Sequence, residues 1–223
     1  MKIKGLRINF LGDSITAGAG VTDIKHNRFD YVMKKKYRLK QVNNYGMGGT
    51  RFAYQTKPSD NPRYDLYFCG RAQKMTKDAD IVVVYGGVND YSSGDAPIGT
   101  PEDTTPATFY GAIEWIMNYL TTEFAHCKIV FLTPAHRTGT FPETGPSTRP
   151  MKRADALPLK GYADIIIEKA KKYNIPVLNM MELLPIDPNI PAHCEKYTTD
   201  GLHFNDEGHK VIAKTIGDFL LNL

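Results

Sequence analysis

Four short polar stretches of this chain carry the residue types that acyl transfer requires. They are Gly12-Asp13-Ser14, Asn44 to Gly49, Gly87 to Asp90 and Asp200 to His203. A serine hydroxyl is a weak nucleophile unless a neighbouring base takes its proton during the attack. Histidine titrates near working pH, which suits His203 to that task, and Asp200 can accept a hydrogen bond from its other ring nitrogen. Ser14, Asp200 and His203 are therefore the candidate catalytic residues.

The same stretches offer donors for the oxyanion that forms when a serine attacks an acyl carbonyl. Such an oxyanion needs hydrogen-bond donors that are already in place. The backbone N–H groups of Ser14 and Gly49 and the side-chain amide of Asn89 are the candidates. The expected substrate contacts, which lie within two residues of these groups, are Asp13, Arg51 and Tyr91.

Each stretch also has an ordinary structural interpretation. A serine can cap a helix, Asn89 and Asp90 can end a strand, and Gly49 can serve only a backbone conformation. His203 and His209 lack the helical spacing, or a nearby cysteine pair, that a zinc site would show. We therefore expect neither a metal nor a cofactor.

In this order, the four stretches resemble the four blocks of the SGNH hydrolases, also called the GDSL esterase/lipase family. Ser14, Gly49 and Asn89 match the first three blocks, and Asp200 with His203 matches the Asp-x-x-His of the fourth. The resemblance implies a three-layer α/β/α, flavodoxin-like fold whose five-stranded parallel sheet has the order 2-1-3-4-5. It also implies a serine esterase in which the matched residues keep their family roles.

The chain departs from the family pattern at three positions. Ile15 replaces the commoner leucine, Thr50 stands where many members have aspartate, and Phe204 stands where proline is frequent. None of these differences removes a group that the chemistry needs, although Thr50 and Phe204 bear on substrate specificity.

The segments between these stretches alternate between strand and helix patterns. Apolar runs predict strands at about 6–11, 41–45, 81–85, 128–132 and 176–179. Apolar residues at helical spacing predict helices at about 27–39, 109–124 and 165–173, and a terminal helix that Asn205 caps. This alternation indicates an α/β protein with a parallel sheet covered on both faces, organised as one domain over residues 1–223. The first three polar stretches follow strands, so such a sheet brings them to one edge.

Two long segments show little periodicity. Residues 57–79 and 134–158 are rich in proline, glycine and polar residues, and we expect irregular structure in both. Segments of this length in a compact domain often have a functional role. Both are compatible with lining the substrate cleft or with a subunit interface, which leaves a homo-oligomer open.

Composition narrows the class of protein. The net charge of +4 over 223 residues is too small and too scattered to indicate a nucleic-acid partner. No apolar run has the length of a signal peptide or a membrane span, so we expect no membrane partner. Three widely spaced cysteines form no disulfide framework, and they favour a reduced, cytoplasmic protein.

We therefore predict a hydrolase that cleaves a short-chain ester, such as an acetyl ester, of a carbohydrate or other small polar molecule. The tilt toward short acyl groups rests on the polar loops and on the lack of an apolar helix that would serve as a lipase lid. A lysophospholipase- or thioesterase-type lipid acylhydrolase and a noncatalytic carbohydrate-binding domain are the alternatives. A flavin- or phosphate-binding protein with glycine-rich turns is a further one, but it gives no reason for the Asp200 and His203 pair.

Overall fold

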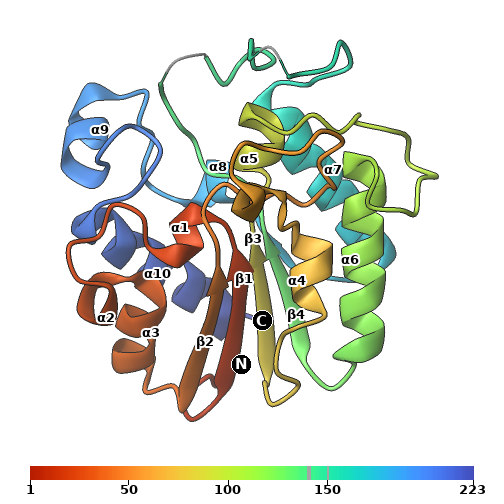
Figure 1. Cartoon of the computed structure of the whole chain (residues 1–223). Coiled ribbons are helices and arrows are strands. Elements are labelled where there is room, and N and C mark those ends of the chain that lie inside the picture. The colour runs from red at the N-terminus through yellow and green to blue at the C-terminus, as the bar shows by residue number, and fades with distance from the viewer. Residues whose placement is uncertain (140–141, 150) are drawn as a thin grey trace.

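A single parallel sheet organises the chain (Figure 1). The computed structural model describes residues 1–139, 142–149 and 151–223. Its strands run in the order β2-β1-β3-β4-β5, as the resemblance implied, and all neighbouring pairs are parallel. Their bounds are β1 Arg7–Gly12, β2 Gln41–Gly46, β3 Ile81–Tyr85, β4 Lys128–Leu132 and β5 Val177–Leu178.

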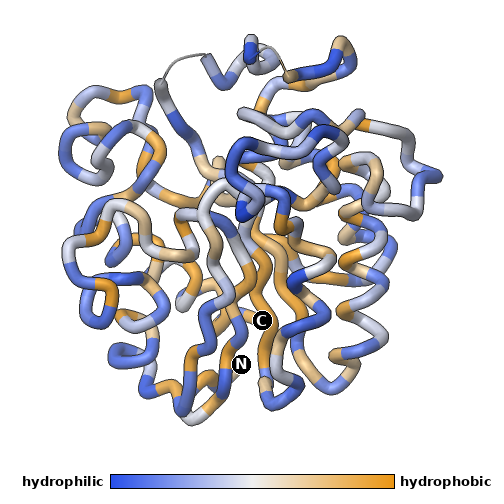
Figure 2. Tube along the Cα trace, viewed as in Figure 1, coloured by the Kyte–Doolittle hydropathy of each residue, from blue (hydrophilic) through white to orange (hydrophobic). Residues whose placement is uncertain are grey.

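Helices cover both faces of this sheet, because side chains alternate along each strand and both faces are apolar (Figures 1 and 2). On β3, Val82 and Val84 pack into one core with α4 (Phe68–Ala72), α6 (Phe109–Glu123) and α7 (Leu159–Lys172). Val83 and its neighbours on β1 pack into the other core with α3 (Phe29–Tyr37) and α10 (Asp206–Leu221). The shorter helices are α1 Ser14–Ala17, α2 Ile24–Asn27, α5 Val88–Ser92, α8 Met180–Leu183, α9 Pro191–Tyr197 and the 3₁₀ helix η1 Pro62–Asp65.

Strand register sets where the chemistry can lie. Gly12 at the end of β1 pairs with Gly46 of β2 on one side and with Tyr85 of β3 on the other. The strands β2, β1 and β3 therefore end at one level, and the turns that follow them meet at one edge of the sheet. This is the edge at which open α/β sheets bind their ligands.

The sequence-based boundaries need four corrections, the first being that the helix expected at 165–173 is α7, which already begins at Leu159. The helix expected at 27–39 is split, because Arg28 has an extended backbone and pairs with Asp30 at 2.6 Å instead of continuing the helix. Residues 57–79 are not wholly irregular, since they contain η1 and α4. The last strand is shorter than 176–179. Within 134–158 the described residues form neither a helix nor a strand before Pro158, and residues 140–141 and 150 of that prediction lie outside the described residues.

Two further features complete the fold. Cys69 of α4 is buried against α6, and its thiol donates to the carbonyls of Phe52 and Ala112. Burial raises the pKa of this thiol well above its usual value.

In the described part of the chain, no helix combines the length and the apolar character needed to cross a membrane.

Candidate active site

The nucleophile candidate sits on the sharp turn between β1 and α1. The Asp13 carboxylate caps α1 by accepting a hydrogen bond from the Ile15 N–H at 3.0 Å, so Ser14 becomes the first residue of the helix. A side chain at Gly12 would lie 1.9 Å from the Thr16 hydroxyl oxygen, so only glycine lets the strand turn this tightly into the helix. The Ser14 hydroxyl is thereby presented at the carboxyl edge of the sheet.

The histidine lies on the loop before α10 and is held by its own aspartate. The Asp200 Oδ1 atom accepts hydrogen bonds from the Leu202 N–H at 3.0 Å and the His203 N–H at 2.7 Å. Asp200 Oδ2 lies 2.7 Å from His203 Nδ1, and His203 Nε2 lies 3.0 Å from Ser14 Oγ. A carboxylate only accepts, so Nδ1 carries the proton and Nε2 is left to accept the proton of Ser14.

The same hydrogen bonds keep the Asp200 carboxyl group ionised. Partial burial alone would raise its pKa, but the hydrogen bonds from His203 and Leu202 outweigh that effect and hold the pKa below its usual value. The Asp200 side chain is 51% exposed and that of His203 is 26% exposed, so the dyad is reached by solvent. Asp200 therefore remains ionised and can stabilise a protonated His203.

The candidate oxyanion donors line the same cavity. Ser14, Gly49, Asn89 and His203 all line one cavity of about 450 Å³. The Asn89 side chain is only 9% exposed, and its Nδ2 donates to the Thr50 carbonyl at 3.0 Å, which fixes the amide. Gly49 has a φ of +76°, a conformation that other residues rarely adopt, and a side chain there would lie 2.4 Å from the Tyr64 ring. In the described part of the chain, neither Ser14 N–H nor Gly49 N–H donates to another residue.

A buried arginine connects these turns on the side away from the cavity, although the sequence suggested that Arg71 could line the substrate cleft or a subunit interface. Arg71 of α4 donates hydrogen bonds to the Gly12 carbonyl and to the Thr50 hydroxyl, at 3.0 and 2.7 Å. It also donates to the Tyr45 carbonyl on β2. Burial lowers the pKa of the Arg71 guanidinium to about 10, so it remains charged at neutral pH. The turns that carry Ser14 and Gly49 are thus tied by one side chain.

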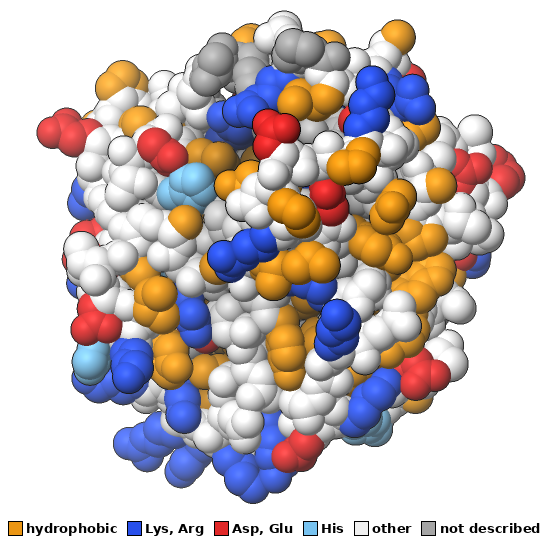
Figure 3. Space-filling model, in the orientation of Figure 1, with side chains coloured by type: hydrophobic (Ala, Val, Ile, Leu, Met, Phe, Trp, Pro, Cys, Tyr) orange, Lys and Arg blue, Asp and Glu red, His pale blue; other side chains and the backbone are white. Residues whose placement is uncertain are grey.

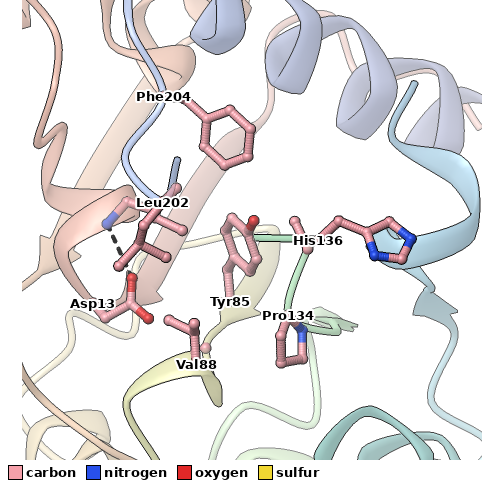
Figure 4. A pocket seen from close by; sticks show the side chains of 10 residues that line it. Asp13, Tyr85, Val88, Pro134, His136, Leu202 and Phe204 are labelled. Atoms are coloured by element: carbon pink, nitrogen blue, oxygen red, sulfur yellow. Dashed lines mark hydrogen bonds between the residues drawn. The ribbon is translucent and has the colours of Figure 1, made fainter. Parts of the chain in front are cut away.

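Two of the three expected substrate contacts are buried away from the cavity. The Asp13 carboxyl faces Tyr85 and Leu202 around a small buried cavity of about 10 Å³ (Figure 4), and burial raises its pKa to about 6. The Tyr91 side chain has no exposed area, and its hydroxyl donates to the carbonyls of Pro142 and Gly145. These side chains support the α1 turn and the 134–158 segment instead of lining the Ser14 cavity. No local pattern in the sequence distinguishes support from contact.

Arg51, the third expected contact, is also mostly buried, and it donates to the Tyr64 carbonyl at 2.8 Å. It lines a neighbouring cavity of about 500 Å³ that shares Gly49 and Tyr64 with the first. All three departures from the family pattern, Ile15, Thr50 and Phe204, are buried as well.

The two irregular segments both line the Ser14 cavity. Arg63 and Tyr64 come from 57–79, and Arg137 and Arg149 come from 134–158. The sequence placed both segments near the cleft as one alternative but did not single out Arg137 or Arg149. Their positions depend on contacts between distant parts of the chain, which no spacing pattern reports.

The second histidine of the region has a different environment. His209 is fully buried in α10, stacks on the Phe29 ring and accepts a hydrogen bond from the Phe29 N–H. Burial lowers its pKa to about 4. No group of three or more His, Cys, Asp or Glu side chains within the described ranges is arranged to hold a metal ion.

Comparisons with known proteins bear on the fold and the family of this chain. A model of the GDSL-like lipase/acylhydrolase family matches residues 10–211. A solved protein from Lactobacillus plantarum is 27% identical, with a TM-score of 0.82 over 99% of this chain and 98% of that one. A possible lipase from Chitinophaga pinensis is 19% identical, with a TM-score of 0.70 over 97% and 98%. An acetyl xylan esterase is 19% identical, with a TM-score of 0.60 over 96% and 100%. No curated protein matches the sequence.

Proposed function

Because this chain belongs to the GDSL-like lipase/acylhydrolase family, whose members hydrolyse ester bonds, we propose that Ser14 is the nucleophile of a serine esterase. The observation that carries the proposal is the unbroken set of contacts from Asp200 through His203 to the Ser14 hydroxyl. Serine, histidine and carboxylate in this arrangement activate the hydroxyl for attack on an acyl carbon.

The reaction proceeds in two halves. His203 Nε2 takes the Ser14 proton as Oγ bonds to the acyl carbon, and the N–H groups of Ser14 and Gly49 with the Asn89 amide bind the resulting oxyanion. The tetrahedral intermediate expels the alcohol, which leaves with the proton from His203. Water then gives a proton to His203 and attacks the acyl-enzyme, and the acid departs as Ser14 regains its proton.

For the substrate, we propose a short-chain ester, such as an acetyl ester, of a carbohydrate or other polar molecule. The lining of the Ser14 cavity supports this, since it consists mainly of Ser, Asn, Gly and Arg residues with Tyr64 and Leu202. A fold neighbour is an acetyl xylan esterase, which is consistent with a polar acetylated substrate.

The test is hydrolysis of p-nitrophenyl esters from acetate to palmitate by the wild type and by Ser14→Ala. We expect highest kcat/KM on the shortest chains and a loss of at least about 10³-fold in the variant, since loss of the nucleophile removes most of the catalysis. Ser93→Ala, a serine of the same cavity, is the matched control. Equal activity of wild type and Ser14→Ala would contradict the mechanism, and preference for long chains would replace the short-chain assignment by a lipid acylhydrolase.

A further inference from the structure

The cavity that holds Ser14 is lined by cationic side chains. Arg63, Arg137 and Arg149 line it together with His203. No aspartate or glutamate within the described ranges lines it. A cleft lined by charges of one sign concentrates its field on a ligand of the opposite sign.

Arg137 is held in place at the wall of this cavity. It is only 7% exposed, and its Nε and one Nη donate to the Thr138 carbonyl, each at 3.3 Å. Burial lowers the pKa of the Arg137 guanidinium, and the like charge of Arg149 lowers it further, whereas Tyr91, Asp200 and Glu143 raise it. Two guanidinium groups that repel one another beside a cavity are both stabilised when an anion binds there.

The other two arginines are exposed and come from different segments. Arg63 lies in η1, and Arg149 lies in the 134–158 segment. Lys and Arg side chains border a recess near the top of the face in Figure 3, at the end of the molecule toward which the strands point in Figure 1. Arginine suits such a site because its planar fork can donate two parallel hydrogen bonds to a carboxylate, phosphate or sulfate.

The neighbouring cavity provides an internal contrast. Arg51, Lys57 and Arg149 line it, but so do Asp60 and Asp95. Asp95 accepts hydrogen bonds from the Thr56 N–H and hydroxyl and from the Lys57 N–H. The charge there is mixed, whereas the arginines that line the cavity of Ser14 have no aspartate or glutamate beside them in its described lining. Of the two cavities, the one that contains Ser14 is therefore the one whose charged lining favours an anion.

We propose that the substrate is an anionic ester, whose carboxylate, phosphate or sulfate group is bound by Arg63, Arg137 and Arg149 while its acyl carbon lies at Ser14. This inference rests on the proposed esterase function and narrows its substrate class. It places the charge close to the scissile bond, because the three arginines and Ser14 share one cavity of about 450 Å³.

Two matched ester pairs test the inference. The acyl-side pair is p-nitrophenyl hydrogen succinate and p-nitrophenyl pentanoate, and the alcohol-side pair is 4-acetoxybenzoate and 4-acetoxybenzamide. The measured quantity is the ratio of kcat/KM for the anionic ester to that for the neutral ester. We expect a ratio above about 10 in at least one pair, since a charged hydrogen bond contributes more than a neutral one. The pair that shows it identifies the side of the ester bond that carries the charge.

The test variants change Arg149, because substitution of an exposed side chain has little effect on folding. Arg149→Gln should lower the ratio about tenfold, and Arg149→Glu should lower it further, because a guanidinium contact is lost and then replaced by repulsion. Arg153→Gln makes the same charge change at an exposed position of the same segment that does not line the cavity, and the ratio should stay within about twofold.

The possible failures are distinguishable. Ser14-dependent hydrolysis with the same ratio in wild type and Arg149→Gln would overturn the anionic substrate and leave the esterase standing. If none of the four esters were hydrolysed, calorimetric titration of the Ser14→Ala protein with succinate and with inorganic phosphate would decide. Binding that Arg149→Gln weakens would support the anion site without the esterase, and absent or unchanged binding would overturn it.

Discussion

The floor and the wall of the Ser14 cavity are built in different ways. The floor is Ser14, Gly49 and Asn89, which follow β1, β2 and β3, whereas the wall is Arg63, Arg137 and Arg149 from the two irregular segments. Asn89 and the support below the floor are buried, and strand register fixes the level of the turns. Two of the three wall arginines are exposed.

The two regions are therefore suited to different tasks, the floor to catalysis and the wall to substrate recognition. Bond-breaking needs donors held to within a fraction of an ångström, which buried strand ends and the Arg71 contacts provide. Recognition of a substrate tolerates more variation, and loops on a rigid scaffold commonly carry it. The floor should therefore determine the rate and the wall should determine the selectivity.

The largest expected contrast compares an asparagine of the floor with the asparagine that precedes the wall residue Arg63 in the same segment. Asn89→Ala removes a proposed oxyanion donor, so kcat should fall about 10²- to 10³-fold with little change in KM. Asn61→Ala removes an asparagine of the same cavity that caps η1, and kcat should fall less than about tenfold. Steady-state kinetics on one neutral ester measures both. Similar losses in kcat would remove the distinction between floor and wall.

Stability should show the same contrast with a smaller effect. Arg71→Met leaves the Tyr45 carbonyl and the Thr50 hydroxyl without a buried charged donor, so the free energy of unfolding should fall by about 3 kcal/mol. Arg149→Met at the exposed wall should change it by no more than about 0.5 kcal/mol. Urea unfolding of both variants measures the two values, and equal losses would show that Arg71 does not hold the floor together.

The smallest expected effect is on the pH dependence of stability. It concerns Asp13, which caps the short helix that begins with Ser14. Folded Asp13 keeps its proton up to a pKa of about 6, whereas the unfolded residue loses it near 3.8, so this residue's contribution to stability declines as pH rises. Asp13→Asn keeps an oxygen to cap α1 and removes the decline. Between pH 5 and 7.5, the unfolding free energy of the variant should rise by about 1.5 kcal/mol relative to the wild type. An equal pH dependence of the two proteins would be inconsistent with a buried, protonated Asp13.

Much of the floor was predictable from sequence. The β-branched run of 81–85 predicts β3 with its exact bounds, because a strand buried on both faces needs apolar residues throughout. The polar residues after each strand could then be placed at one edge without knowing any long-range contact. The structure brings Ser14 and His203 together although they are 189 residues apart, as the resemblance implied.

The wall and the supporting contacts were not predictable in the same way. Arg137 and Arg149 lie in a segment without periodicity, so nothing local indicates that both face Ser14. Arg71 looks like one charge among many in 57–79, and its role depends on α4, a helix too short to leave a clear pattern. Tyr91 follows Asn89 closely, yet the turn of α5 directs it under the 134–158 segment.

The rate at which the buried thiol of Cys69 is alkylated measures how often the core of this protein opens. A thiol reacts with alkylating reagents as the thiolate, and burial both suppresses that form and blocks access. Alkylation of Cys69 must therefore wait until α4 separates from α6, whereas the half-buried Cys127 and Cys194 are accessible earlier. Because α4 also carries Arg71, the rate at which mass accumulates on Cys69 reports how often the support beneath the catalytic turns comes apart.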